Sequence, residues 1–411
     1  MNYDEALEYI HSLQIFGSIP GLERISQLLS KLGNPQDKLK FIHVAGTNGK
    51  GSTCTMLSEI FCKAGYKTGL YTSPFVIDFR ERICFCGEYI EKEILAELCE
   101  EVMNTGITVT EFEFITALAM LYFLRKQCDI VILETGLGGR FDATNVIKAP
   151  LVSVITKIDY DHTAYLGDTL SKIAMEKCGI IKDDCPTVSY PLQEKEALYT
   201  IKHYAKNLTV PSTDMLEIKH TGLDGNTFIY KGTEYTTKLI GEHQVYNAVT
   251  AIETVNASGI NIPDSIMQNA IANTKFPARM EIISKSPLLI LDGAHNPDGA
   301  KALAGVLGGF SKNIVAVIGM MADKNCDDFL KATLPFCKSV ITVEVKENPR
   351  SISATDLAEI ALKYCKDVYS ADSYDEALTK AKLKSEGNMP IFVFGSLYLA
   401  GAIRDKLISA F

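Results

Sequence analysis

The chain has 411 residues, of which 41 are basic and 50 acidic, so its formal charge is −9. Apolar residues make up 47% of the chain and charged residues 22%, which is typical of a globular protein and not of a disordered or fibrous one. The acidic balance argues against a broad electrostatic grip on nucleic acid or on an anionic membrane, so an anionic ligand must be held by a local site. At roughly 150 residues per domain, the length predicts two or three domains.

The N-terminal residues, the longest apolar run and the cysteines all point to a soluble cytoplasmic protein. The first five residues are acidic and lead into an amphipathic helical pattern, which argues against a secretory signal. The longest apolar stretch, around residues 114–124, is shorter than the ~20 residues that a membrane span needs. The 11 cysteines include no Cys-x-x-Cys pair, so we expect reduced thiols that mostly fill the core.

Between Lys40 and about Pro277, short apolar runs alternate with helical patterns. Residues 41–45 form a strand that runs into a glycine-rich turn, and the helix that follows ends at Gly65 with four apolar side chains on one face: Met56, Leu57, Ile60 and Phe61. Residues 129–133 and 151–155 are continuous apolar strands of the kind that a parallel sheet buries on both faces. Residues 219–238, with Asp224-Gly225-Asn226 between their arms, predict a hairpin.

After Pro277 the pattern restarts with four apolar strands separated by helical stretches, at residues 288–291, 314–318, 340–343 and 391–394. This predicts an α/β protein of two domains, 1–277 with a parallel-rich sheet and 278–411 as a smaller α/β unit.

The strongest chemical signal lies between the first strand and its helix, in Gly46-Thr47-Asn48-Gly49-Lys50-Gly51-Ser52. Backbone N–H groups converge in such a turn, and Lys50 can neutralise phosphate charge while Ser52 or Thr53 approaches a magnesium ion. The spacing differs from the common nucleotide-binding loop, and the alternative is a plain glycine turn. By itself the loop predicts ATP or GTP binding and says nothing of the reaction.

A second cluster, residues 133–145, begins at the carboxyl end of a buried strand, where the ligand sites of open α/β sheets collect. Glu134 can hold Mg²⁺ opposite the phosphate loop, and Arg140 can bind a carboxylate with two hydrogen bonds. The alternative is a tight turn capped by Asp142.

Two further residues allow both a functional and an ordinary structural interpretation. His162 follows the strand 151–155, which makes a metal role as plausible as a structural one. Lys177 lies among apolar residues, so it is either a solvated helix lysine or a lysine of depressed pKa that reacts as the neutral amine or forms a carbamate.

The second domain offers weaker candidates at the end of its first strand. Asp292 could accept a hydrogen bond from a ribose hydroxyl, and His295 could stack on a base or touch phosphate. Arg279, near the domain boundary, could move onto the phosphates when the domains close.

Taken in order, these motifs resemble the folylpolyglutamate synthase/dihydrofolate synthase family of the Mur ligase superfamily. The resemblance runs from Gly21-Leu22-Glu23-Arg24 to Phe394-Gly395-Ser396. It is carried by the loop 46–52, Thr72-Ser73-Pro74-Phe75, residues 134–145, Asp161-His162, Glu176-Lys177 and residues 292–297. Two small departures are Cys178, where the family usually has alanine, and Asn325, where it often has aspartate.

The resemblance implies a P-loop-like ATP-binding domain, a smaller Rossmann-like domain and an active site between the two. ATP would be bound by Asn48, Gly49, Lys50, Gly51, Ser52, Asn247, Arg279, Asp292 and His295. Two magnesium sites would draw on Ser73, Glu134 and His162, with Lys177 carbamylated. Lys50, Glu134, His162 and Lys177 would be the catalytic residues. The folate or pterin would contact Pro74, Phe75, Arg82, Thr116, Arg140, Phe141, Asp142 and Ala143.

The implied activity is ATP-driven addition of L-glutamate to the γ-carboxylate of a folate through an acyl phosphate, in a monomeric enzyme. Whether the enzyme also converts dihydropteroate to dihydrofolate stays open, because the shape of the pterin pocket decides it. The alternatives are a P-loop NTPase acting as a kinase or switch, and a sibling ligase acting on a nucleotide-linked sugar. The sibling would need a larger N-terminal substrate domain than the roughly 45 residues before the phosphate loop allow.

Overall fold

The computed structural model describes residues 1–17, 19–310, 312–346 and 348–410. The chain divides into two compact units. The N-terminal unit consists of Met1–Ile218, Phe228–Thr236 and Val245–Thr274, and the C-terminal unit of Lys219–Thr227, Thr237–Gln244 and Lys275–Phe411.

The N-terminal unit is built on an eight-stranded sheet of order β4-β3-β2-β5-β1-β6-β7-β8. Six strands run parallel, and β3 and β4 pair antiparallel at one edge. The strands are β1 (Phe41–Ala45), β2 (Thr68–Tyr71), β3 (Ile83–Phe85), β4 (Glu88–Tyr89), β5 (Ile130–Glu134), β6 (Val152–Ile155), β7 (Thr187–Ser189) and β8 (Leu208–Thr209). The three strands expected from the sequence, β1, β5 and β6, lie side by side at its centre and are fully buried.

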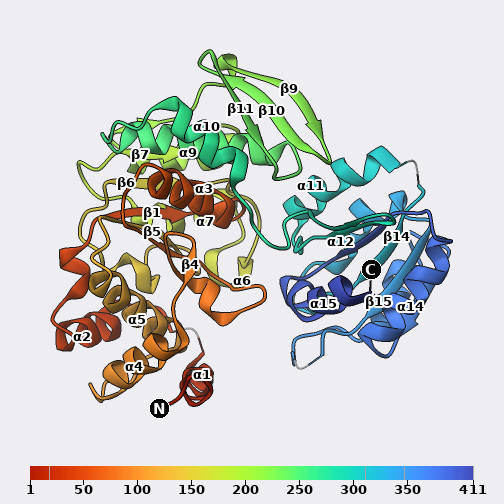
Figure 1. Ribbon diagram of the computed structural model, residues 1–411, viewed down its shortest axis with the longest axis horizontal. Helices are drawn as coiled ribbons and strands as arrows, with labels where there is room; N and C mark the ends of the chain where they lie inside the picture. Colours follow the sequence, from red (N-terminus) through yellow and green to blue (C-terminus); the bar gives the residue numbers. More distant parts are fainter. Residues whose placement is uncertain (18, 311, 347, 411) are drawn as a thin grey trace. The chain divides into compact units, whose positions relative to one another are not determined.

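Helices cover both faces of this sheet, as Figure 1 shows around β1 and β5. One layer contains α1 (Tyr3–Ser12), α2 (Glu23–Lys31), α4 (Lys92–Met103) and α5 (Glu111–Arg125), which share one hydrophobic core. The other contains α3 (Lys50–Lys63) and α10 (Asp264–Asn273), which pack together. The remaining helices are α6 (Thr163–Leu166), α7 (Leu170–Lys177), α8 (Lys195–Tyr204) and α9 (His243–Ala257).

Sequence periodicity explains the first layer and the phosphate-loop helix. Residues 114–123 of the apolar stretch are the buried body of α5, which begins at a Thr110/Glu113 capping box. Met56, Leu57, Ile60 and Phe61 of α3 are all buried, as the 3.6-residue period predicts.

No helix in the described ranges is long and apolar enough to cross a bilayer. All 11 cysteines are free thiols.

The hairpin expected at residues 219–238 is confirmed and gains a third strand. It joins β9 (Leu216–Gly222) to β10 (Gly225–Tyr230), and β11 (Thr233–Thr237) pairs on the other side of β10. Gly225 begins β10 at φ +113°, where a Cβ would lie 2.1 Å from the Thr237 carbonyl oxygen. The glycine is therefore required by the close approach of two backbones.

The C-terminal unit contains a six-stranded sheet of order β12-β13-β17-β14-β15-β16, parallel except for the β12–β13 pair. Its strands are β12 (Glu281–Lys285), β13 (Leu288–Leu291), β14 (Val315–Ile318), β15 (Ser339–Val343), β16 (Val368–Ala371) and β17 (Ile391–Phe394). Its helices are α11 (Pro297–Leu307), α12 (Cys326–Thr333), α13 (Ala354–Ala361), α14 (Tyr374–Ser385) and α15 (Leu397–Ala410). The four strands expected from the sequence are confirmed, and β12 and β16 are added at the edges.

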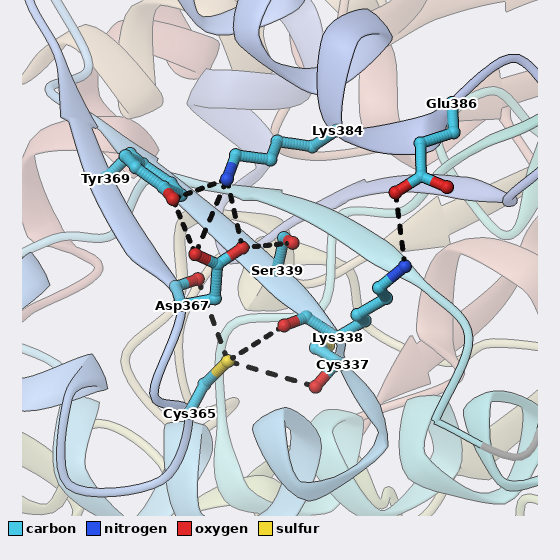
Figure 2. A network of polar contacts seen from close by, with 8 residues as sticks. All are labelled: Cys337, Lys338, Ser339, Cys365, Asp367, Tyr369, Lys384 and Glu386. Carbon is cyan, nitrogen blue, oxygen red and sulfur yellow. Dashed lines mark hydrogen bonds and ion pairs between the residues drawn. The ribbon is translucent and has the colours of Figure 1, made fainter.

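A polar network next to β16 holds this edge strand (Figure 2). The Asp367 carboxylate accepts hydrogen bonds from Ser339 Oγ and Tyr369 Oη, each at 2.5 Å, and pairs with Lys384. The Cys365 thiol lies 3.8 Å from the carbonyl oxygen of Cys337. These groups satisfy one another, so we assign the network a structural role.

Candidate active site

The phosphate loop lies between β1 and α3 and is held by the segment that follows β6. The amides of Thr47 and Asn48 donate to the Lys157 carbonyl at 2.8 and 3.1 Å, and the Thr47 hydroxyl donates to the Asp159 carbonyl at 3.0 Å. Gly49 has φ +85°, and a Cβ there would lie 2.4 Å from Asn247 Oδ1. Among the described residues no side chain caps the N-terminus of α3, so its backbone N–H groups suit an anion.

Lys50 and Glu134 meet beside this loop. Lys50 Nζ donates to the Thr47 carbonyl at 3.2 Å and lies 4.0 Å from Glu134 Oε1. Glu134 ends β5 and is 4% exposed, and its Oε2 accepts a hydrogen bond from the Ser73 amide at 3.3 Å. Because β1, β2 and β5 are parallel neighbours, their carboxyl ends bring together three residues that are far apart in the sequence.

Lys177 approaches the same loop from the end of α7. Its side chain is buried, and Nζ donates to the Gly46 carbonyl oxygen at 2.7 Å. Burial and the nearby Lys50 cation lower the pKa of Lys177 to about 7, against the opposing effect of Asp161 and Asp142. An appreciable part of this lysine is therefore the neutral amine near neutral pH.

His162 lies on the loop after β6, where it precedes α6 with φ +49°. Its ring is 43% exposed, and Nε2 is 3.9 Å from Asp161 Oδ1. Among the residues that the structure describes, no three His, Cys, Asp or Glu side chains come together as a metal site. A buried Glu134 beside Ser73 still fits Mg²⁺, which takes one or two protein carboxylates and completes its shell with substrate phosphates and water.

The loop after Glu134 is anchored twice. The Asp142 carboxylate accepts the amides of Gly136 and Leu137 at 2.9 and 2.8 Å, and the amide and hydroxyl of Thr144 at 3.0 and 2.5 Å. Burial raises the pKa of Asp142, although these hydrogen bonds oppose the change. Asp142 and Ala143 are buried, whereas Phe141 is 53% exposed.

The second anchor joins this loop to the residues around Lys177. The Arg140 amide donates to the Glu176 carbonyl at 2.8 Å. A Cβ at Gly179 would lie 2.4 Å from the Arg140 Cα, so only glycine allows the two backbones to approach this closely.

Three of the residues expected to contact the pterin, Pro74, Phe75 and Arg82, lie between β2 and β3. Pro74 follows a cis peptide bond, and the Arg82 guanidinium lies 5.3 and 5.7 Å from the ring centres of Phe75 and Phe79. The Arg82 Nε is buried and has no hydrogen-bond partner in the described part of the chain.

Thr116 of α5, which is also expected to contact the pterin, is fully buried. It donates to the Phe112 carbonyl at 2.7 Å and lies 3.1 Å from the Tyr71 hydroxyl. Its hydroxyl hydrogen is therefore used in a hydrogen bond within the protein core.

The candidates of the C-terminal unit lie around the end of β13. The Asp292 carboxylate accepts the amides of Met280 and Ala294, each at 2.8 Å, and His295 Nδ1 is 2.9 Å from the Gly293 carbonyl. The Arg279 guanidinium lies 5.1 Å from the Phe276 ring centre, and its Nη1 would be 2.6 Å from a Cβ at Gly293.

Sequence reasoning missed two buried or half-buried groups that support these loops. Glu81 accepts the amides of Val76, Ile77 and Asp78 at 2.8 to 2.9 Å and so shapes the loop that begins at Ser73. His43 of β1 is bonded to Thr144 at 2.8 Å. For His43, the only signal in the sequence was a histidine inside a continuous apolar strand. For Glu81, the sequence carried no signal.

The chain matches two family models along most of its length. The Mur ligase middle domain matches residues 44–255, and the Mur ligase glutamate ligase domain matches residues 278–397. A folylpolyglutamate synthase of Lacticaseibacillus casei is 35% identical, with 99% of each chain covered. A dihydrofolate synthase/folylpolyglutamate synthase of Bacillus subtilis is 36% identical over 98% of this chain and 99% of its own.

Solved structures agree over the whole chain. Escherichia coli FolC in complex with DHPP and ADP has a TM-score of 0.89 at 30% identity, covering 100% of this chain and 98% of its own. A Mycobacterium tuberculosis folylpolyglutamate synthase complexed with ADP and AMPPCP has a TM-score of 0.88 at 29% identity, covering 99% of both chains. With the phosphate loop, Glu134 and Lys177 in place, the chain belongs to the Mur ligase family, in its folylpolyglutamate synthase/dihydrofolate synthase branch.

Proposed function

We propose that this protein is an ATP-dependent ligase that joins the amine of L-glutamate to the γ-carboxylate of a folate. The observation that carries the proposal is the approach of Lys50 to within 4.0 Å of Glu134 beside an uncapped helix N-terminus. This pairing places a cation for phosphate oxygens next to a carboxylate for a metal ion. The names of the full-length relatives, folylpolyglutamate synthase and dihydrofolate synthase/folylpolyglutamate synthase, supply the substrate class.

The chemistry needs activation because a carboxylate would have to expel oxide to react with an amine. In the proposed route, a carboxylate oxygen attacks the γ-phosphorus of ATP, the bond to the β-phosphate oxygen breaks, and an acyl phosphate and ADP result. The glutamate amine then attacks the acyl carbon, loses a proton and expels inorganic phosphate. The protein contributes by positioning and by stabilising charge, as in other phosphoryl transfers, and needs no nucleophile of its own.

Several residues take defined parts in this proposal. The backbone of 48–51 and the Ser52 hydroxyl bind the triphosphate, and Lys50 offsets negative charge that develops on the transferred phosphoryl group. Asn247, whose amide group lies against Gly49, contacts the nucleotide. From the C-terminal unit, Arg279, Asp292 and His295 are proposed as further nucleotide contacts.

Mg²⁺ would be held by Ser73, Glu134 and His162, and a carbamylated Lys177 would help to hold a second ion. Such ions supply Lewis-acid stabilisation of phosphoryl oxygens when bound. Lys177 suits carbamate formation because its buried amine is partly neutral near pH 7, and only the neutral amine attacks CO₂. We propose Pro74, Phe75, Arg82, Thr116 and residues 140–143 for the folate side.

The organisation proposed is an ATP-binding and folate-binding domain over residues 1–277 and a C-terminal domain over residues 278–411. The protein is proposed to act as a cytoplasmic monomer. A P-loop NTPase acting as a switch would share the phosphate loop, but its ATP use would be independent of glutamate.

Phosphate release from ATP, measured with Mg²⁺ and L-glutamate, tests the proposal. A reduced folate monoglutamate and dihydropteroate are supplied in separate reactions, and the peptide-linked product is identified by mass spectrometry. Release with the folate alone indicates a dedicated polyglutamate synthase, and release with both indicates a bifunctional enzyme. Release with neither substrate would contradict the ligase, and release that is independent of glutamate would favour the NTPase.

A further inference from the structure

His43 is a fully buried histidine at the centre of the N-terminal sheet. Alternation along β1 places it on the same face as Phe41, which belongs to the core shared with α5 and α2. The short 3₁₀ helix Ala143–Val146 packs on these two helices, and its Ala143 belongs to the same core. Here His43 Nε2 lies 2.8 Å from Thr144 Oγ1.

The direction of the hydrogen bonds follows from counting hydrogens. Thr144 has one hydroxyl hydrogen, and it points to Asp142 Oδ1 at 2.5 Å, a length typical of a bond to a carboxylate. The Thr144 oxygen must then accept from His43, so the imidazole proton lies on Nε2. His43 Nδ1 is buried without a hydrogen-bond partner in the described residues. An orphaned acceptor there costs less than an orphaned N–H donor would.

The chain of bonds ends at the loop that follows Glu134. Asp142 Oδ2 accepts the amides of Gly136 and Leu137, which are the second and third residues after Glu134. Burial, together with the Lys182 cation, lowers the pKa of His43 to about 3, so the ring stays neutral at working pH.

We propose that His43, as a neutral imidazole protonated on Nε2, is a positioning residue that fixes the 136–142 loop through Thr144 and Asp142. The structural half of the proposal stands independently, whereas its kinetic consequence rests on the proposed ligase function. Because this loop carries Arg140 and Phe141, the affinity for the folate should depend on His43, while the affinity for ATP should not.

The reverse order of protons is the competing arrangement. A protonated Asp142 would donate to Thr144, and Thr144 would donate to an imidazole protonated on Nδ1. That arrangement leaves a buried Nδ1–H without an acceptor, and it requires a carboxylic acid that still receives the Gly136, Leu137 and Thr144 amides. In that arrangement, an NMR spectrum would show the imidazole proton on Nδ1 and not on Nε2.

The first measurement is a long-range ¹H–¹⁵N NMR spectrum of the ¹⁵N-histidine-labelled full chain, with the His43 signals assigned by their loss in His43→Gln. The chain has only 7 histidines, which keeps the spectrum simple. We expect a pyrrole-like Nε2 and a pyridine-like Nδ1 that do not change between pH 5.5 and 8.5. A proton on Nδ1, or an imidazolium in this range, would overturn the proposal.

The second measurement is kinetic and uses matched pairs. Thr144→Val and His43→Leu remove the link and should raise KM for the folate, with KM for ATP within about twofold. The increase should be about tenfold or more for Thr144→Val, which loses a bond to a carboxylate, and about threefold to tenfold for His43→Leu, which loses a bond between two neutral groups. Thr144→Ser and His43→Gln retain a hydroxyl and a donor, respectively, and should recover most of the loss.

The double variant His43→Leu/Thr144→Val distinguishes positioning from general packing. If His43 acts only through Thr144, the double variant should be no worse than Thr144→Val alone. Additive losses, or equal increases in both KM values, would overturn the positioning role. A wild-type chain without glutamate-dependent turnover would instead contradict the proposed function, while the NMR result would still decide the proton arrangement.

Discussion

The ammonium nitrogen of Lys177 donates a hydrogen bond to the carbonyl oxygen of Gly46 at 2.7 Å, and so ties the end of α7 to the first residue of the phosphate loop. The amide of Arg140 in turn donates to the carbonyl of Glu176, the residue before Lys177. One short segment therefore joins the proposed nucleotide loop to the proposed folate loop.

Lys50→Ala should lower kcat by about 10²–10³-fold or more, because Lys50 is the cation next to the proposed phosphoryl site. The thermal midpoint should change little, since the bond of Lys50 Nζ to the Thr47 carbonyl is 3.2 Å long and its ion pair with Glu134 is long, at 4.0 Å. Lys63→Ala, at the exposed far end of the same helix, is the matched control and should keep wild-type turnover. Normal turnover of Lys50→Ala would remove Lys50 from the mechanism.

Glu134→Gln should raise the Mg²⁺ concentration needed for half-maximal activity at least tenfold, because the amide keeps the shape but loses the charge that attracts the ion. Activity is titrated with Mg²⁺ at fixed ATP. The acceptor for the Ser73 amide is retained in the variant, so the loop at Ser73 should keep its conformation. An unchanged Mg²⁺ requirement would mean that Glu134 does not hold the ion.

Lys177 should make stability depend on pH. Its folded pKa of about 7 lies below the ordinary lysine value of about 10.4, so between these values the unfolded chain binds more protons than the folded one. Its contribution should raise the free energy of unfolding with pH across this window, by at most about 1.4 kcal/mol per pH unit, and stay constant outside it. Urea unfolding at pH 7 to 10 should show a smaller rise for Lys177→Met than for the wild type. Equal slopes would contradict the lowered pKa.

Carbamylation of the same lysine is testable separately. In ¹³C-bicarbonate at pH 8, the wild type should show one carbamate carbonyl signal in the ¹³C NMR spectrum that Lys177→Met lacks. Lys172→Met, on the exposed face of the same helix, is the control and should retain the signal. A signal that survives in Lys177→Met would assign the carbamate elsewhere.

Glu81→Ala should raise KM for the folate, because the amides of Val76, Ile77 and Asp78 lose their common acceptor and the Ser73–Phe75 loop loses its shape. The rise in KM should be about tenfold, as expected for the loss of hydrogen bonds to a charged group, and smaller for Glu81→Gln. Glu88→Ala, on the exposed neighbouring strand β4, should behave as the wild type. Equal KM values for the folate in Glu81→Ala and Glu88→Ala would mean that the loop does not depend on the Glu81 carboxylate.

Gly179→Ala should destabilise the protein by roughly 2 kcal/mol or more, since the new methyl group would lie 2.4 Å from the Arg140 Cα and both are backbone positions that cannot rotate away. Gly305→Ala offers the opposite case, because it lies inside α11 with open space around it and should stabilise by about 0.5–1 kcal/mol. Urea unfolding measures both. A neutral Gly179→Ala would show that the two backbones separate readily.

Local patterns in the sequence were enough to predict the central strands of the two sheets. β1, β5, β6, β13, β14, β15 and β17 were all expected, because continuous apolar runs of four or five residues are typical of strands buried on both faces. The short strands β3, β4, β7 and β8, at or next to the edges of the sheet, were not, since two or three residues carry no periodic signal. The family resemblance, and with it the activity, was also available from the motifs alone.

Tertiary structure decided which of these motifs meet. Glu134, Ser73 and Lys50 come together because parallel strands that are distant in the sequence end at one edge of the sheet, and strand order is not written in any local pattern. The lowered pKa of Lys177 follows from burial and from Lys50, 127 positions away in the chain, so it could only be proposed from the sequence. The supporting roles of His43 and Glu81 depend on single hydrogen-bond distances, which only the folded chain defines.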